Sequence, residues 1–206
     1  GVCRECLLDT SHTNIQTHVY AWWAGFEDEE SVIASYKACA GTAPGQCDVA
    51  PWQDCGLAAE VTLEVVGAPL AHGTTVYTTV HATNRAGLDV VASSDGTTVD
   101  LTPPTVTEVN VGMLHGIHST QQSFLDMMFA NVFASDDLAP IYEFVMCIGT
   151  SKGVCDVLEP RTVSSMDGNT TDVEGYFVVG LYGLTLKKEA VLYVGATATN
   201  AAGVHI

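Results

Sequence analysis

The stretch VYTTVHATNRAGL, residues 76–88, returns as LYVGATATNAAGV at residues 192–204, an offset of 116. The first half of each copy alternates β-branched or apolar residues with others, which is typical of a half-buried strand. The Asn and Gly that follow are turn residues, because Asn can bond its own backbone and Gly permits a positive φ. The block therefore predicts a strand that ends in a tight turn, a structural role without chemistry.

A second block is also repeated. IASYKACAGTAPGQCDV at residues 33–49 aligns without a gap on IYEFVMCIGTSKGVCDV at residues 141–157, an offset of 108. The larger offset of the later block places about eight extra residues in the second copy, around SSMDGNTTD, which has loop composition. Between the copies lies DLTPP, whose prolines cannot continue a sheet ladder. We expect two repeats, residues 1–103 and 104–206, joined near Pro103 and Pro104.

The local signal within both copies is strand. Short segments rich in β-branched and aromatic residues, separated by Gly, Pro, Asp and Asn, occur at residues 17–23, 60–66, 75–83, 123–129, 175–184 and 191–199. This spacing predicts an all-β chain of two tandem antiparallel β-sandwiches. Only three residues follow Gly203, so we expect the second sandwich to lack its last strand here. Either the chain continues in a longer array, or a strand from another chain completes the edge.

The F-strand pattern resembles a known family. Its residues are Leu70, Gly73, Val76, Thr78, Val80, Ala82, Asn84 and Gly87. They resemble the E–F corner and F strand of fibronectin type III and related immunoglobulin-like repeats, and Trp23 and Tyr36 are similar to that family's strand B tryptophan and strand C tyrosine. In the second copy Trp23 aligns with Asn131, so we expect Phe129 and Phe133 to fill the core there.

The amino-acid sequence of the repeats is also similar to that of the tandem sandwich repeats of very large surface and matrix proteins in algae and invertebrates. WAGFEDEES, ATNRAGL and SDGTTVDLTPP carry this second resemblance. It implies a structural or adhesive array in an extracellular matrix, on a cell surface, or in filaments of the flagellar or ciliary surface. The implied partners are further copies or neighbouring repeats.

Two cysteine pairs occur at matching places. A turn at GTAPG brings Cys39 opposite Cys47, and GTSKG does the same for Cys147 and Cys155. Directly opposed strand residues have Cα separations of about 4.5–5.5 Å, which a disulfide accepts. The alternative is four free thiols in a reducing cytosol. We predict both disulfides, and with them an oxidising, extracellular compartment.

Three cysteines remain. Among Cys3, Cys6 and Cys55 at least one lacks a partner within the chain, which suggests a disulfide to a neighbouring segment or molecule. In an extracellular protein Asn169, in the sequence NTT, becomes a candidate glycosylation site.

The strongly acidic composition limits the kinds of binding partner that the chain can have. Seven Lys and Arg against 24 Asp and Glu give a net charge of -17, which disfavours nucleic acid and anionic membranes, and no apolar run is long enough to span a bilayer. Acidic clusters make Glu27, Asp28, Asp136 and Asp137 weak calcium candidates, although a solvated loop is the commoner explanation of such a cluster. No other cofactor is expected.

Catalysis has little support in the sequence. No Ser, Cys or Asp has a recognisable base beside it in a known motif, and HGIH at residues 115–118 lacks a third metal ligand on a defined element. We therefore expect a non-enzymatic structural or adhesive array that associates with itself. The alternative is an accessory module of a secreted enzyme that binds glycans or a protein, with Trp22 and Trp52 exposed for stacking on sugars.

Overall fold

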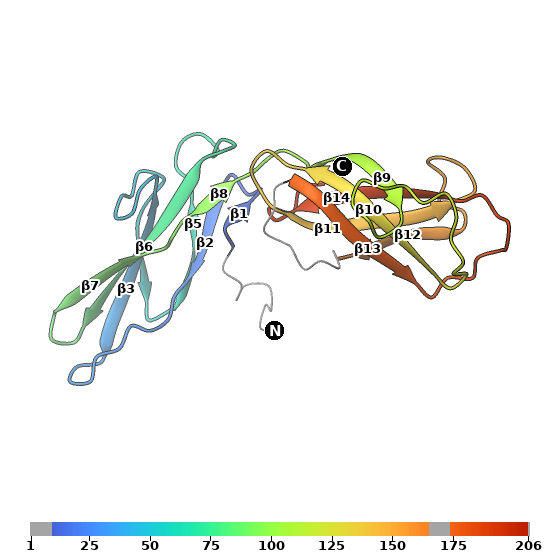
Figure 1. Cartoon of the computed structure of the whole chain (residues 1–206). Helices are drawn as coiled ribbons and strands as arrows, with labels where there is room; N and C mark the ends of the chain where they lie inside the picture. Colours follow the sequence, from blue (N-terminus) through green and yellow to red (C-terminus); the bar gives the residue numbers. More distant parts are fainter. Residues whose placement is uncertain (1–9, 165–173, 206) are drawn as a thin grey trace. The chain divides into compact units, whose positions relative to one another are not determined.

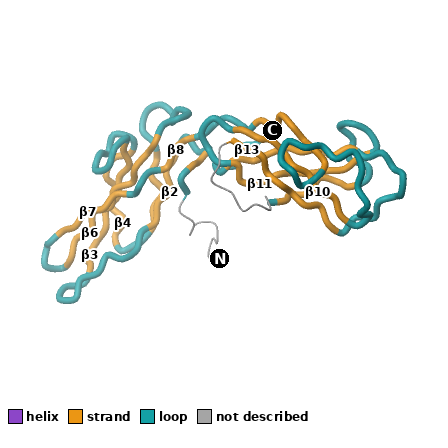
Figure 2. Tube along the Cα trace, viewed as in Figure 1, coloured by secondary structure: helices purple, strands orange, loops and turns teal. Residues whose placement is uncertain are grey.

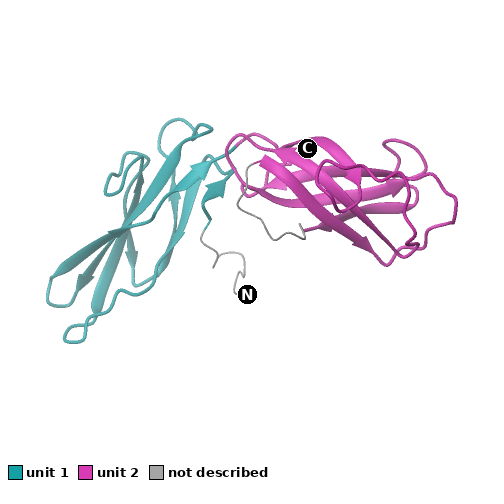
Figure 3. Ribbon diagram, viewed as in Figure 1, with its two compact units in different colours: residues 1–100 teal, residues 101–206 magenta. Residues whose placement is uncertain are grey.

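The computed structural model describes residues 10–164 and 174–205, and their regular secondary structure is β strand (Figures 1 and 2). The chain divides into two compact units, residues 1–100 and 101–206 (Figure 3). This division lies shortly before Pro103 and Pro104, where the boundary was expected. Among the described residues there is no helix with the length and apolarity needed to cross a membrane.

Unit 1 is a sandwich of two sheets. The smaller sheet pairs β2 (His18–Trp22) with β5 (Glu60–Glu64) antiparallel. The larger sheet has the order β1 (His12–Thr13), β8 (Thr97–Val99), β6 (Thr75–Asn84), β3 (Ile33–Gly41) and β4 (Ala50–Gly56), with β7 (Asp89–Ser93) also paired to β6. The pairing of β1 with β8 is parallel, and the others are antiparallel.

Unit 2 repeats this architecture. One sheet has the order β13 (Glu174–Tyr182), β10 (Met127–Ser135) and β9 (Thr105–Val111). The other has the order β12 (Leu158–Val163), β11 (Ile141–Gly149) and β14 (Tyr193–Asn200). All pairings in unit 2 that the structure describes are antiparallel. The expected fold class, an all-β chain of two tandem β-sandwiches built mainly of antiparallel strands, is confirmed.

The two units differ at their first and last strands. β9 has no counterpart beside β2 in the described part of unit 1. In unit 2, Thr199 forms a single bridge to His205, and the matching pair in unit 1, Thr83 and Asp89, begins the ladder between β6 and β7. Up to residue 205, therefore, the last strand of unit 2 shows only its first pair.

The core of unit 2 comes from alternate residues of facing strands. On β10 the buried series is Met128, Ala130 and Val132, as the two-residue period of a strand requires. Phe144 and Phe177 meet in the interior with ring centroids 5.3 Å apart. These two rings supply the large aromatic volume of this core.

The expectation that Phe129 and Phe133 fill this core is wrong. Both alternate with the buried series of β10, and they pack edge-on against Tyr182 and Tyr176. Asn131 is fully buried on that same side, because its side-chain amide donates to carbonyls of the loop after β9. Successive side chains of a strand point to opposite faces, so the neighbours of the core series lie on the other side of β10.

Unit 1 places its aromatic residues as the resemblance implied. Trp23, directly after β2, is 8% exposed and packs edge-on against Tyr36 with ring centroids 5.5 Å apart. Leu63 of β5 and Val99 of β8 are fully buried in the same unit.

Candidate functional site

A hydrogen-bonded corner joins the end of β6 to the loop before β3. The Asn84 side-chain amide donates to the Asp28 carboxylate at 2.9 Å, and the Asn84 side-chain oxygen accepts from the Leu88 amide at 2.8 Å. The same carboxylate accepts from the backbone amides of Glu30 and Ser31. The Asn84 bond is the main cause that lowers the pKa of Asp28, because each of these donors favours the charged form.

Unit 2 builds the same corner from Asn200 and Asp136. The Asn200 amide donates to Asp136 and to the Thr102 carbonyl, each at 3.0 Å, and the Val204 amide donates to the Asn200 side-chain oxygen at 2.9 Å. The Asp136 carboxylate also accepts from the amides of the two residues that follow Asp137. Sequence reasoning predicted that Asn would bond its own backbone but missed its carboxylate partner.

These corners account for part of the acidic clusters. Asp28 and Asp136, two of the calcium candidates, accept hydrogen bonds that hold loops in place. Asp137 accepts a hydrogen bond from the Thr102 hydroxyl, and Glu27 is exposed. Asp136 and Asp137 line a pocket of about 290 Å³ together with Glu174. Calcium binding there remains a prediction.

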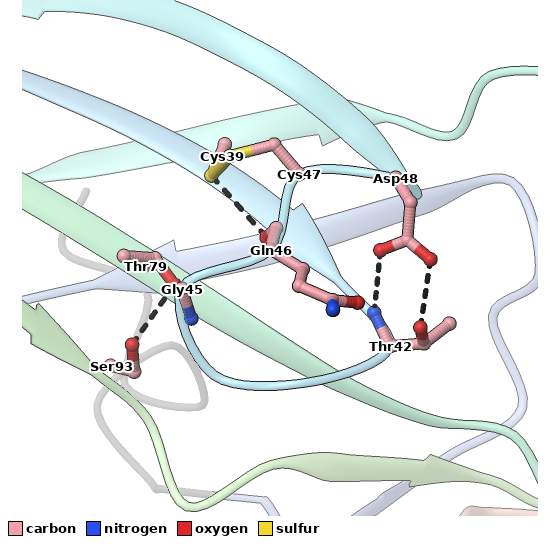
Figure 4. Close-up of a disulfide and its surroundings, with 8 residues drawn as sticks. All are labelled: Cys39, Thr42, Gly45, Gln46, Cys47, Asp48, Thr79 and Ser93. Atoms are coloured by element: carbon pink, nitrogen blue, oxygen red, sulfur yellow. Dashed lines mark hydrogen bonds between the residues drawn. A yellow bond between two sulfur atoms is a disulfide. The ribbon is translucent and has the colours of Figure 1, made fainter.

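Both predicted disulfides are present. Cys39 and Cys47 have Cα atoms 5.3 Å apart, and Cys147 and Cys155 have Cα atoms 5.4 Å apart (Figure 4 shows the first pair). One premise of the prediction is wrong: Cys47 and Cys155 lie in the loops before β4 and β12 and are not strand residues. The loop folds back far enough to close the bond before strand pairing resumes at Ala50.

An aspartate follows the second cysteine and braces each disulfide loop. Asp48 accepts from the Thr42 amide at 2.9 Å and from the Thr42 hydroxyl at 2.7 Å (Figure 4). Asp156 accepts the same pair of bonds from Thr150, each at 2.7 Å. The hydroxyl bond is the first cause that lowers the pKa of both aspartates.

A glycine is required at the start of each loop. A Cβ on Gly41 would collide with the Gln46 carbonyl, and one on Gly149 would collide with the Val154 carbonyl. The repeated letters GT, G and CDV therefore describe one loop structure, used twice.

Of the other cysteines and the candidate glycosylation site, the structure describes only Cys55. Cys3, Cys6 and Asn169 lie outside the described residues. Cys55, near the end of β4, is partly buried and is not in a disulfide. Burial is the first cause that raises the pKa of the Cys55 thiol, which keeps it protonated and less nucleophilic at neutral pH. A disulfide from Cys55 to another molecule remains a prediction.

The exposed tryptophans lie on different sheets. Trp22 of β2 is 41% exposed, and Trp52 of β4 is 46% exposed. Trp52 contacts His81 edge-on with ring centroids 6.1 Å apart, and His81 pairs with Asp89 at 3.2 Å. The two tryptophans therefore belong to separate surfaces.

Trp22 has an aromatic neighbour of its own. Tyr20, two residues earlier on the same face of β2, is 40% exposed and donates a 2.7 Å hydrogen bond to Glu60 of β5. That bond raises the pKa of the Tyr20 hydroxyl. Tyr20, Trp22 and Glu60 thus present two aromatic rings beside a carboxylate, and we call these three residues the β2 aromatic face.

The histidines of HGIH pack onto unit 2. His115 stacks on Tyr176 with ring centroids 5.6 Å apart, and the Val111 amide donates to Nδ1 of His118 at 3.2 Å. Each ring thus has a structural contact of its own.

Comparisons with solved structures found several chains of similar fold, and one of them is described here. A crystal structure of the FN1–FN3 domains of chicken CNTN1 is similar to this chain, with 12% sequence identity and a TM-score of 0.49. The similarity covers 95% of this chain and 60% of that one. No protein-family model and no curated protein matches the sequence.

Proposed function

We propose that this chain is a non-enzymatic structural or adhesive segment of a large extracellular protein, in which tandem sandwiches build a matrix, a cell-surface layer or a flagellar-surface filament by self-association. The observation that carries the proposal is the duplication of two scaffold devices. Both units have the asparagine–aspartate corner and the disulfide loop braced by an aspartate. The repeated polar side chains are thus the ones that hold loops.

The two disulfides support an extracellular location. Disulfides form and persist mainly in oxidising environments such as the extracellular space. A net charge of -17 on a chain of 206 residues also favours solubility in a salty medium, where screening reduces repulsion between neighbouring copies. Self-association would therefore strengthen with ionic strength if lateral contacts are otherwise apolar.

Sedimentation velocity and negative-stain microscopy of the purified chain test self-association. We would compare residues 1–206 with a longer polypeptide in which two copies of this chain are joined in tandem, each from low to high micromolar concentration and from low to high salt. The proposal predicts larger assemblies as concentration and salt rise, and larger ones still for the tandem polypeptide. A strictly monomeric chain under all these conditions would contradict self-association.

The β2 aromatic face favours one alternative function, a glycan-binding module. Flat aromatic rings stack on sugar rings, and the Glu60 carboxylate is an acceptor for sugar hydroxyls. Glycan-array binding tests this alternative. Trp22→Ala should abolish any signal that depends on this face, whereas Trp52→Ala, on the other sheet, serves as the matched control. Equal binding by both variants would exclude the β2 aromatic face as a glycan site.

A further inference from the structure

Basic residues gather at one end of unit 2. The chain has seven Lys and Arg, and Lys187 and Lys188 are adjacent in the turn between β13 and β14, where both are exposed. Lys152, also exposed, lies in the disulfide loop after β11. Because Gly149 at the end of β11 pairs with Tyr193 at the start of β14, the two loops lie at the same end of the sandwich. A chain of net charge -17 therefore has a locally basic region.

Exposed apolar side chains adjoin the two adjacent lysines. Phe124, in the loop before β10, its neighbour Leu125, and Val191, just before β14, are large exposed hydrophobic residues. The Leu186 amide donates to the Leu125 carbonyl at 2.9 Å, so the two loops lie side by side. Exposed apolar side chains that lie together mark interaction surfaces. The basic end surface, as we call it, consists of Phe124, Leu125, Lys187, Lys188 and Val191.

The turn that carries the lysines has a fixed and uncommon backbone. The Ala190 amide donates to the Lys187 carbonyl at 3.3 Å, which closes the turn. Glu189 has a φ of 65°, a left-handed conformation that residues other than glycine rarely adopt. Such backbone strain is concentrated at sites that bind or switch. The turn therefore holds the lysines in a defined place.

Unit 1 has a surface of the opposite charge. Three exposed glutamates lie in the loop before β3, next to the exposed Val32. The Arg85 amide donates to the Val32 carbonyl at 3.0 Å, which places the turn after β6, with the exposed Leu88, beside this loop (Figure 1). The glutamates outnumber Arg85, the basic residue of this turn. The acidic end surface, as we call it, consists of Glu27, Glu29, Glu30, Val32 and Leu88.

Each surface lies away from the residues that join the units. In unit 1 the end of β8 is beside the start of β6, since Thr98 pairs with Thr75, whereas the acidic end surface adjoins the end of β6. In unit 2 the start of β9 is beside the end of β10, since Thr105 pairs with Ser135, whereas the basic end surface adjoins the start of β10. Within its own unit, each surface is therefore at the end opposite the linking residues.

The local charges of these surfaces decide whether two copies can touch there. At physiological ionic strength the Debye length is about 8 Å, so exposed charges farther apart than this are largely screened. A contact between copies then depends on the charges that face each other and much less on the net charge of -17. Opposite charges across a contact favour encounter, and like charges oppose it.

We propose that the basic end surface of one copy binds the acidic end surface of a second copy. The apolar side chains of both surfaces are buried by this contact, and the lysines face the glutamates around them. Because the two surfaces differ, the contact is heterologous, and repeating it gives an open row of copies unless the rotation closes a ring. This inference rests on the proposed self-association and names the surfaces that carry it.

Reciprocal charge exchange, followed by sedimentation velocity at about 0.15 M salt, tests the proposal. One variant carries Lys187→Glu and Lys188→Glu, and the other carries Glu29→Lys and Glu30→Lys. Each variant alone should associate at least about tenfold more weakly than the parent chain, because it brings like charges together in the contact. An equal mixture of the two variants should associate again, because every contact between unlike copies then joins opposite charges.

Two variants with the same change in net charge provide the matched control. Lys187→Gln with Lys188→Gln removes two positive charges, and Lys37→Glu, at an exposed position of β3, lowers the net charge by the same amount. The first variant should weaken association, and the second should not. Equal weakening by both would attribute the effect to net charge and overturn the assignment.

The remaining outcomes separate this proposal from self-association itself. If the parent chain associates and the charge-exchange variants associate as strongly, the end surfaces are not the contact, although self-association stands. The same conclusion follows if both variants are weakened and their mixture does not recover. If the parent chain and the mixture are both strictly monomeric, both proposals fail.

Discussion

Asn84 donates a 2.9 Å hydrogen bond to the Asp28 carboxylate, 56 residues earlier in the chain, and Asn200 repeats this bond to Asp136 at 3.0 Å. In both units one asparagine side chain thus bonds the turn after one strand and the loop before another. The short Asn-containing motif therefore forms a hydrogen bond between residues that are far apart in the sequence.

Replacing Asn84 with Ala should destabilise unit 1 by about 1–3 kcal/mol, because the Leu88 amide loses its side-chain acceptor and the Asp28 carboxylate loses a donor. Chemical denaturation followed by tryptophan fluorescence measures this, since all three tryptophans lie in unit 1. Arg85→Ala, at an exposed position of the same turn, is the control and should change little. An unaffected midpoint in Asn84→Ala would show that the corner does not stabilise the unit.

Asn200→Ala should have the corresponding effect on unit 2. Hydrogen exchange of β11 and β14 reports on that unit, and protection there should fall while β3 and β6 keep theirs. A loss spread equally over both units would mean that the effect is not local to the corner.

The folded chain should lose stability in acid. Hydrogen bonds lower the pKa of Asp28, Asp48 and Asp156 below the usual value of about 3.9. A lowered carboxyl pKa stabilises the fold at pH values above the unfolded pKa, and this stabilisation disappears as pH falls through the folded pKa. We therefore expect a melting temperature that declines below about pH 4.

Asp48→Asn and Asp156→Asn should make that acid decline shallower, because each removes one group whose pKa changes on folding. Asp54→Asn, on the exposed part of β4, is the control. Thermal unfolding followed by circular dichroism, at several pH values from acidic to neutral, measures how steeply the melting temperature of each variant declines. A steeper decline in the Asn variants than in the parent chain would contradict the assignment.

Each disulfide should stabilise its own unit. By the chain-entropy relation, a bond across a sequence separation of 8 is worth about 2.5 kcal/mol. The double variant Cys39→Ser with Cys47→Ser should lower the stability of unit 1, and the pair at Cys147 and Cys155 should lower that of unit 2. Hydrogen exchange assigns each loss to a unit. If both double variants keep parental stability, the loops do not depend on their disulfides.

Gly149→Ala should destabilise unit 2 by about 1–3 kcal/mol, the usual range for overpacking, because the added Cβ collides with the Val154 carbonyl. Ser151→Ala, exposed in the same loop, is the matched control. Thermal unfolding with the disulfide intact separates the steric effect from loss of the bond. Equal melting temperatures for the two variants would disprove the collision.

Much of the fold could be predicted from the sequence because two sequence blocks occur in both repeats. Two gapless blocks locate the strands, the disulfide pairs and the turn asparagines. The Asp28 partner of Asn84 was missed because nothing local connects them, although Asp28 and Asp136 stand at the same offset of 108 as the first block. That shared offset was the available signal.

Core detail was harder to predict for a geometric reason. Aligning Trp23 with Asn131 is wrong, because the core side of β10 carries Met128, Ala130 and Val132, whereas Asn131 is buried on the other side, against the loop after β9. In a strand, a one-residue shift moves every side chain to the opposite face. The expected roles of Phe129 and Phe133 failed for this reason, while Phe144 supplies the volume.

The small span of the disulfides has a mechanical consequence. Each disulfide joins cysteines only 8 positions apart. When a unit is stretched, the disulfide therefore prevents only about 26–29 Å of its chain from extending. The rest of each unit is free to lengthen once its ladders break. Under tension the load falls on hydrogen bonds between strands, and a tandem chain of such units would yield one unit at a time, as an extensible tether rather than a covalently stiffened rod.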